Sequence, residues 1–178
     1  MKKAIKLCLI LILTAVLLIQ PAFAAASFPD TSGHWAEAHI DYLFTQGLIN
    51  GYPDGTFRPN NTISRAEVAA ILANELSLPL QNSSFPDVPG THWATGYIGA
   101  VVNASIMSGY PDGTFKPNTP MTRAEIASVL ASAYNLTASF SQSPFSDVTS
   151  SHWAFASIVA LADNDVTTGY PDGTYRPA

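Results

Sequence analysis

The stretch Gly109-Tyr110-Pro111-Asp112-Gly113-Thr114-Phe115-Lys116-Pro117 decides the fold of this chain, together with Thr122-Arg123-Ala124-Glu125 just after it. Proline is preset for the second position of a tight turn, aspartate bonds to nearby backbone, and glycine accepts a positive φ. Thr122 and Glu125 have capping-box spacing, in which each side chain satisfies a backbone N–H at the start of a helix. The chain is therefore expected to reverse direction and then to enter a helix.

This pattern recurs along the chain. The turn is found again at 51–59 and 169–177, and the helix start is found again at 64–67. In all three copies the first glycine of the turn lies sixteen positions after the tryptophan of a His-Trp-Ala motif. Recurrence at a fixed spacing is the signature of a repeat architecture. The predicted repeats span 28–84, 85–144 and 145–178. The third is expected to be partial, because it contains no second helix start.

Apolar periodicity predicts two kinds of helix. One begins at each tryptophan, and we expect it to end near Gly47 in the first repeat and just before Gly109 in the second, because glycine ends helices readily. The other spans 65–76 and 123–134. Helices with one apolar face cannot bury that face alone, so the repeats must pack on one another. The predicted fold is all-α, with 65–76 and 123–134 packed through their apolar stripes. Residues 145–178 are expected to be less protected, because their helix lacks a partner.

The N-terminal segment has the pattern of a signal peptide. Three lysines precede an apolar run from Leu7 to Ile19, and Ala22-Phe23-Ala24 supplies the small residues of a cleavage site. The apolar run has thirteen residues, whereas a membrane-spanning helix needs about 20. We therefore predict that residues 1–24 are a signal peptide and that the exported chain has no stable membrane insertion.

The composition after the predicted cleavage restricts the class of partner. Five cationic and thirteen acidic residues remain, which gives a formal net charge of −8. Nucleic acid and anionic membrane surfaces both attract positive charge, so neither is an expected partner. The remaining chain has no cysteine, and stability must therefore come from packing rather than from disulfides.

Catalytic and metal-binding motifs are absent from the sequence. It contains no Gly-x-Ser-x-Gly, no His-Glu-x-x-His and no phosphate-binding loop. His34, His92 and His152 occupy the same position of three different repeats, which favours a structural role at the helix start over metal ligation. The single aspartate of each turn is far from the set of ligands that calcium needs. We expect no enzyme activity, no metal and no cofactor.

The cationic residues gather in the repeated motif, as Arg58, Arg65, Lys116, Arg123 and Arg176. Arg65 and Arg123 fall in the first turn of a helix, where the helix dipole disfavours a cation by roughly 0.3–1 kcal/mol. Another interaction must therefore retain them. An anion bound by the guanidinium and by free N–H groups of the helix start is one explanation. An ion pair with Asp30, Asp87 or Asp147 of a neighbouring repeat is the other.

Two further sets of side chains belong to the same motifs. Trp35, Trp93 and Trp153 suit either the stacking of a sugar ring or the anchoring of a helix in the core, and the sequence leaves both open. Glu67 and Glu125 are explained by the capping box. Alanine at Arg65 or Arg123 is thus expected to weaken binding without disturbing the helices, whereas alanine at Glu125 should mainly lower stability.

Taken together, Phe-x-Asp, His-Trp-Ala, Gly-Tyr-Pro-Asp-Gly-Thr-Phe-x-Pro and [Ser/Thr]-Arg-Ala-Glu resemble the S-layer homology (SLH) domain. The resemblance implies a pseudo-threefold helical assembly of repeats that holds surface proteins on the bacterial cell wall. It also implies a ligand, a secondary cell-wall polysaccharide that often bears a pyruvate ketal, bound in grooves between repeats. The ligand-binding residues expected here are Arg65, Arg123, Trp35, Trp93, Trp153, Ser64, Thr122, Gly51 and Gly109.

The function that follows is a non-catalytic anchoring module at the cell wall or cell surface. One alternative is a structural or self-assembly module that binds peptidoglycan or other SLH chains in a surface layer. Another is the anchor of a cell-wall hydrolase whose enzyme domain is absent from this chain.

Overall fold

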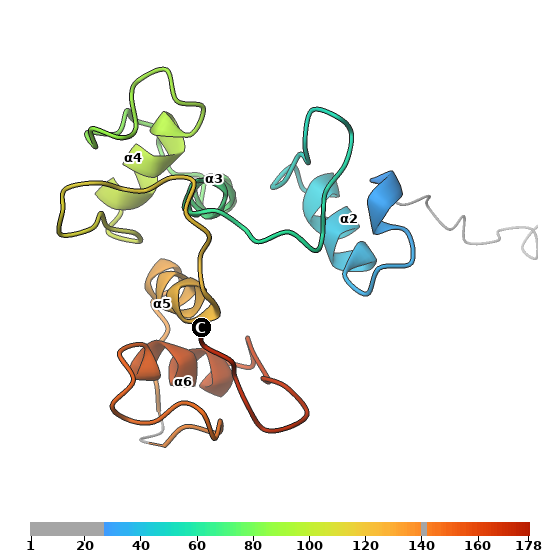
Figure 1. Ribbon diagram of the computed structural model, residues 1–178, viewed down its shortest axis with the longest axis vertical. Helices are drawn as coiled ribbons and strands as arrows, with labels where there is room; N and C mark the ends of the chain where they lie inside the picture. Colours follow the sequence, from blue (N-terminus) through green and yellow to red (C-terminus); the bar gives the residue numbers. More distant parts are fainter. Residues whose placement is uncertain (1–26, 140–141) are drawn as a thin grey trace, which may run out of the picture. The chain divides into compact units, whose positions relative to one another are not determined.

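The computed structural model describes residues 27–139 and 142–178, and its elements are drawn in Figure 1. The chain divides into a first unit, Met1–Pro59, and a second unit, Asn60–Ala178. The predicted signal peptide, 1–24, lies outside the described residues. None of the helices within 27–139 and 142–178 is both long enough and apolar enough to span a bilayer.

The first unit is a short helical segment closed by its turn. It contains a 3-10 helix η1 (Pro29–Thr31) and the helix α2 (Glu37–Thr45). The buried ring of Phe28 lies 5.0 Å from that of Phe44 and 5.4 Å from that of Phe57. The Asp30 carboxylate accepts the backbone N–H groups of Phe57 and Arg58 at 2.9 and 2.6 Å, which ties the start of the repeat to its turn.

The second unit contains two pairs of helices. These are α3 (Arg65–Glu75) with α4 (Thr95–Asn103), and α5 (Arg123–Ala133) with α6 (Phe155–Asp163) (Figure 1). Over the described residues there is no strand, and the pair Ser64 and Pro120 forms one isolated antiparallel bridge. The predicted all-α architecture is confirmed.

Each helix pair joins two sequence repeats. Leu72 of α3, from the first repeat, shares a core with Ile98 and Phe115 of the second. Ala127 of α5, from the second repeat, shares a core with Ile158 of the third. The helix that follows one turn therefore completes the core of the next repeat. Val129 of α5 joins the core of α3 and α4, so the expected contact between the two apolar stripes is also present.

The expectation that residues 145–178 lack a covering helix was wrong. Ile158 and Leu161 of α6 are at most 3% exposed, because α5 packs on them. The sparsely packed helix is instead α2 of the first unit, whose buried residue is Ile40. The error came from pairing each tryptophan helix with the helix of its own repeat.

The helix starts agree with the sequence-based expectations more closely than the helix ends do. Both capping boxes form, with Glu67 accepting the N–H of Ser64 at 2.7 Å and Glu125 that of Thr122 at 2.8 Å. The tryptophan helices begin two residues after the tryptophan rather than at it. The first ends as expected beside Gly47, which has φ 72°. The second ends at Asn103, well before Gly109, because Ser105 takes the left-handed conformation with φ 59°.

Candidate functional site

The helix starts in the second unit dock onto backbone carbonyl groups of the following repeat. The N–H of Arg65 donates to the carbonyl of Thr119 at 3.0 Å, and the N–H of Ala66 donates to that of Pro117 at 2.9 Å. The N–H of Ala124 donates to the carbonyl of Pro177 at 3.0 Å. The expectation that these N–H groups are free for an anion was wrong, because the next turn already occupies them.

The Arg65 side chain is fixed by the same turn. Its Nε atom donates to the carbonyl of Phe115 at 2.8 Å, and its Nη2 atom donates to that of Ser108 at 2.7 Å. The guanidinium carbon lies 4.8 Å from the ring centre of Tyr110 and 4.6 Å from that of Phe115. The residue is 7% exposed. These contacts explain how a cation is retained in the first turn of a helix.

Arg123 repeats this arrangement one repeat later. Its Nε atom donates to the carbonyl of Tyr175 at 2.9 Å, and the Tyr175 hydroxyl donates to the carbonyl of Arg123 at 3.2 Å. Its guanidinium carbon lies 5.1 Å from the ring centre of Tyr170 and 4.6 Å from that of Tyr175. Both arginines thus clamp the turn of the next repeat.

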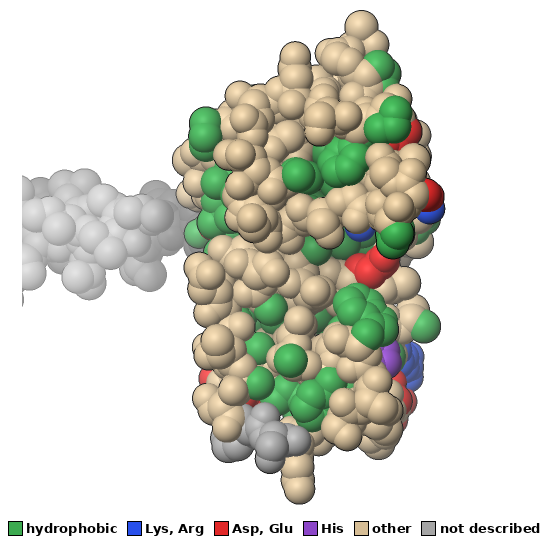
Figure 2. All heavy atoms as spheres, turned by 90° about the vertical axis from the view of Figure 1, so that its left-hand side faces the viewer, with side chains coloured by type: hydrophobic (Ala, Val, Ile, Leu, Met, Phe, Trp, Pro, Cys, Tyr) green, Lys and Arg blue, Asp and Glu red, His purple; other side chains and the backbone are tan. Residues whose placement is uncertain are grey.

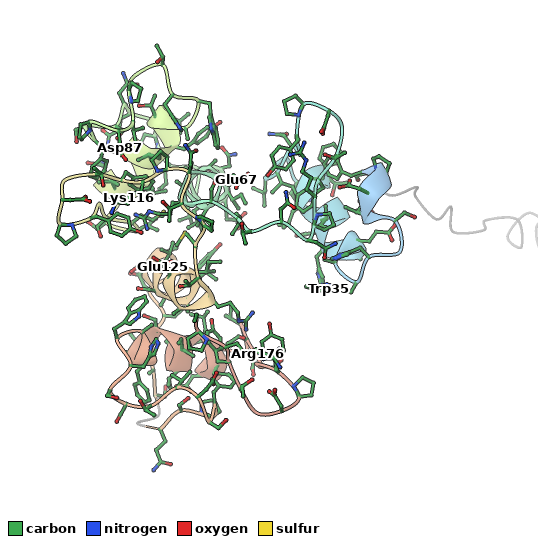
Figure 3. The ribbon with its side chains drawn as sticks, viewed as in Figure 1. Trp35, Glu67, Asp87, Lys116, Glu125 and Arg176 are labelled. Atoms are coloured by element: carbon green, nitrogen blue, oxygen red, sulfur yellow. The ribbon has the colours of Figure 1, made fainter. Side chains whose placement is uncertain are left out.

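Within the described part of the second unit, neither Arg65 nor Arg123 forms an ion pair with Asp87 or Asp147, as the alternative explanation required. Asp87 instead accepts the backbone N–H groups of Phe115 and Lys116, at 2.9 and 2.7 Å (Figure 3). Asp147 accepts those of Tyr175 and Arg176, each at 2.7 Å. The N–H of Tyr175 is the main reason why the pKa of Asp147 is lowered.

The remaining cations pair with the aspartates of their own turns. The pairs are Arg58 with Asp54, Lys116 with Asp112 and Arg176 with Asp172, at 2.6, 2.9 and 2.9 Å. Figure 2 shows acidic and basic side chains close together along one edge of its view. The pKa of each of these aspartates is lowered to about 2, first by the threonine hydroxyl in the turn and then by the cation. The turn itself therefore accounts for these carboxylates.

The tryptophans project into solvent. Trp35, Trp93 and Trp153 are 83%, 58% and 65% exposed, which rules out their anchoring helices in the core. Each lies beside the histidine that precedes it, with ring centres 5.6 to 5.9 Å apart. An exposed indole can stack on an apolar face of a ligand.

The histidines have the structural role expected of them. In each repeat the Nδ1 atom of the histidine accepts the backbone N–H of the alanine after the tryptophan, at 3.1 to 3.2 Å. Among the described residues no group of three potential metal-ligating side chains gathers.

A groove of about 330 Å³ opens in the second unit, and residues from all three repeats line it. The first repeat contributes Arg65, the second contributes Gly109 and Tyr110 from its turn, and the third contributes Trp153. We name this cavity the Arg65 groove. Gly109 cannot be replaced without strain, because a Cβ atom there would collide with the ring of Phe85.

Helix α5 supplies a polar part of the groove lining. Glu125, Ser128 and Ser132 all line it, and their spacing along α5 places them on one face of the helix. Sequence reasoning missed these residues, because it assigned Glu125 to the capping box alone. The sequence does contain a signal for them. Three polar residues recur three and four positions apart in a helix that is otherwise mostly apolar.

The groove brings together Arg65, Gly109 and Trp153 of the nine expected ligand-binding residues. Ser64 and Thr122 use their hydroxyl groups to cap helices. Of the others, Trp93 and Arg123 belong to the second unit but not to the groove lining, and Gly51 and Trp35 belong to the first unit.

Comparisons with known proteins agree with this arrangement. The family model of the S-layer homology domain matches residues 27–69, 84–127 and 144–178. S-layer protein EA1 of Bacillus anthracis is 42% identical over 67% of this chain and 14% of its own length. The cellulosome-anchoring protein of Acetivibrio thermocellus is 38% identical over 73% of this chain and 31% of its own length. An uncharacterised cell wall amidase of Bacillus anthracis is 34% identical over 90% of this chain and 31% of its own length.

The chain thus spans only 14 to 31% of the length of these three relatives. Its relatives include S-layer proteins and a cell surface glycoprotein, which supports the expected location at the cell surface. The three matched segments contain all the motifs that build the turns and the helix pairs. The chain belongs to the S-layer homology domain family.

Proposed function

We propose that this chain is a non-catalytic anchoring module that attaches a bacterial surface protein to the cell wall by binding a secondary cell-wall polysaccharide in the Arg65 groove. The observation that carries the proposal is the convergence of a fixed guanidinium, a tight glycine turn and an exposed indole from three repeats. An acidic sugar presents an anion and an apolar ring face, which match Arg65 and Trp153.

The donors of Arg65 support an anionic ligand. A guanidinium has five N–H donors, and two of its nitrogen atoms each use one on carbonyl groups of the turn. The remaining donors can serve a carboxylate such as that of a pyruvate ketal. Because the turn already holds the side chain in place, little conformational entropy is lost when the ligand binds.

The relatives favour anchoring over catalysis. One relative is a cellulosome-anchoring protein, and two others are S-layer proteins. The amidase relative favours a second candidate, in which this module anchors a cell-wall hydrolase, since the match leaves most of the amidase's length outside it. In both candidates the groove binds and does not react.

A pull-down with purified sacculi tests the proposal. Sacculi of the producing bacterium should bind the chain, and sacculi from which mild acid has removed the secondary polymer should not. Binding that survives the extraction would instead indicate peptidoglycan as the ligand. Sedimentation of the chain without sacculi would indicate self-assembly. Zymography on the full-length protein tests whether it also carries a hydrolase.

A further inference from the structure

Glu125 both caps α5 and lines the Arg65 groove. One of its carboxylate oxygens accepts the N–H of Thr122 at 2.8 Å, and an ionised carboxylate offers about four acceptor sites. The same residue lines the Arg65 groove and is only partly buried. The cap therefore holds an acceptor in a fixed place while leaving part of it available to a ligand.

The face of α5 that carries Glu125 is polar along its length. Ser128 and Ser132 follow on the same face and also line the groove. Within 27–139 and 142–178, neither hydroxyl group has a hydrogen-bond partner in the protein. At the corresponding positions of α3, the repeat has Ala70 and Asn74. Because α3 forms with other residues at these positions, the helix itself does not need the two serines.

The charges in the groove limit what can bind there. Arg65 attracts an anion, whereas Glu125 repels one, so a ligand that is only an anion gains little from the pair. A ligand that carries an N–H or O–H donor close to its anionic group satisfies both residues. Hydroxyl and amide groups of an acidic sugar provide such donors, whereas a bare phosphodiester backbone does not.

We propose that Glu125 is a specificity-determining residue, which accepts a hydrogen bond from a sugar hydroxyl or amide next to the ligand's acidic group, with Ser128 and Ser132 continuing the contact along the glycan. This contact selects an acidic sugar over an anionic polymer that is bound by charge alone. This inference rests on the proposed function, because it assigns a further contact in the same groove.

The substitution Glu125→Gln tests the idea without removing the cap, because glutamine also serves in a capping box. Glu67→Gln is the matched control, since it makes the same change in the capping box of α3 (Figure 3), away from the groove lining. Binding of the whole chain to purified sacculi is measured with melting curves for both variants.

Glu125→Gln should weaken binding to sacculi about five- to tenfold, because a charge-assisted hydrogen bond becomes a neutral one. Glu67→Gln should bind like the unsubstituted chain. Sodium pyruvate supplies a carboxylate without a donor, so as a competitor it should inhibit the Glu125→Gln variant more strongly than the unsubstituted chain. Ser128→Ala and Ser132→Ala should each weaken binding a fewfold with unchanged melting.

The possible failures are distinguishable. If the unsubstituted chain does not bind sacculi, the proposed function fails and this inference fails with it. If it binds and Glu125→Gln binds equally well or more tightly, the anchoring function stands and the role of Glu125 is overturned. A loss of binding that Glu67→Gln shares, or that follows a lowered melting temperature, would also overturn it.

Discussion

The Nε atom of Arg65 donates to the carbonyl oxygen of Phe115 at 2.8 Å, across fifty positions of the chain. Arg123 makes the same contact with Tyr175 at 2.9 Å. The arginine of the repeated helix start is therefore a structural link to the next repeat as well as a candidate ligand-binding group. This double role changes what a substitution at Arg65 should do.

Arg65→Ala should lower the free energy of unfolding of the second unit. The substitution removes two hydrogen bonds from a buried guanidinium and leaves the carbonyl groups of Phe115 and Ser108 without their donor. The expected loss is about 2–4 kcal/mol. Urea denaturation measures it, and Arg176→Ala is the control, because that exposed arginine pairs within its own turn and should cause no measurable loss. Equal stability of the two variants would contradict the clamp.

Trp153→Ala should weaken binding to sacculi while leaving the melting temperature unchanged, because the indole is 65% exposed and lines the groove. Loss of one stacking contact corresponds to about 0.5–1.5 kcal/mol, or roughly two- to tenfold in affinity. Trp93→Ala is the control, because Trp93 is 58% exposed in the same unit and does not line this groove, and it should affect binding less. An equal effect of both would show that the groove is not the principal site.

Stability should fall in acid as the turn aspartates are protonated. The pKa values of Asp54, Asp112 and Asp172 are lowered to about 2, below the ordinary value of an aspartate, 3.8. A depressed pKa in the folded state gives stability that is present above the unfolded pKa and is lost as the pH falls through the folded one. Urea midpoints should therefore be steady from pH 7 to 5 and should fall between about pH 4 and 2. Asp112→Asn should reduce the size of that fall, and an unchanged pH profile would argue against this assignment.

Hydrogen exchange should rank the tryptophan helices by how well they are covered. Backbone amides of α4 and α6 should be protected, since α3 and α5 pack on them. Amides of α2 should exchange faster, because that helix buries Ile40 alone and local opening is easiest where few apolar contacts hold an element. Mass spectrometry of peptides from each helix makes the comparison. Faster exchange in α6 than in α2 would contradict it.

Local rules predicted the parts of the fold that depend on neighbouring residues. Ser64 with Glu67, and Thr122 with Glu125, identify helix starts because both partners of each cap lie within four residues of each other. The helix pairing was not predictable in the same way. The contacts that fix it run from Arg65 to backbone carbonyl groups of the next repeat. Every residue has such a carbonyl group, so the sequence does not show which ones accept a hydrogen bond.

The candidate site was only partly predictable for a related reason. An indole has the same apolar character in a core and on a surface, so the exposure of Trp153 could not be read from its type. The dual position of Glu125 was hidden because the capping box already accounted for it. The position of a cation at a helix start pointed to Arg65, the family resemblance added Gly109, and the structure placed the serines of α5 in the same groove lining.

The pairing of α3 with α4 and of α5 with α6 also fixes where this protein can be cut. A fragment that starts at Asn60 keeps both helix pairs and both arginine contacts. A fragment that starts at Phe85, where the second sequence repeat begins, separates α4 from α3 and exposes the core around Ile98. The smallest piece that keeps a complete helix pair therefore runs from the end of one turn to the end of the next.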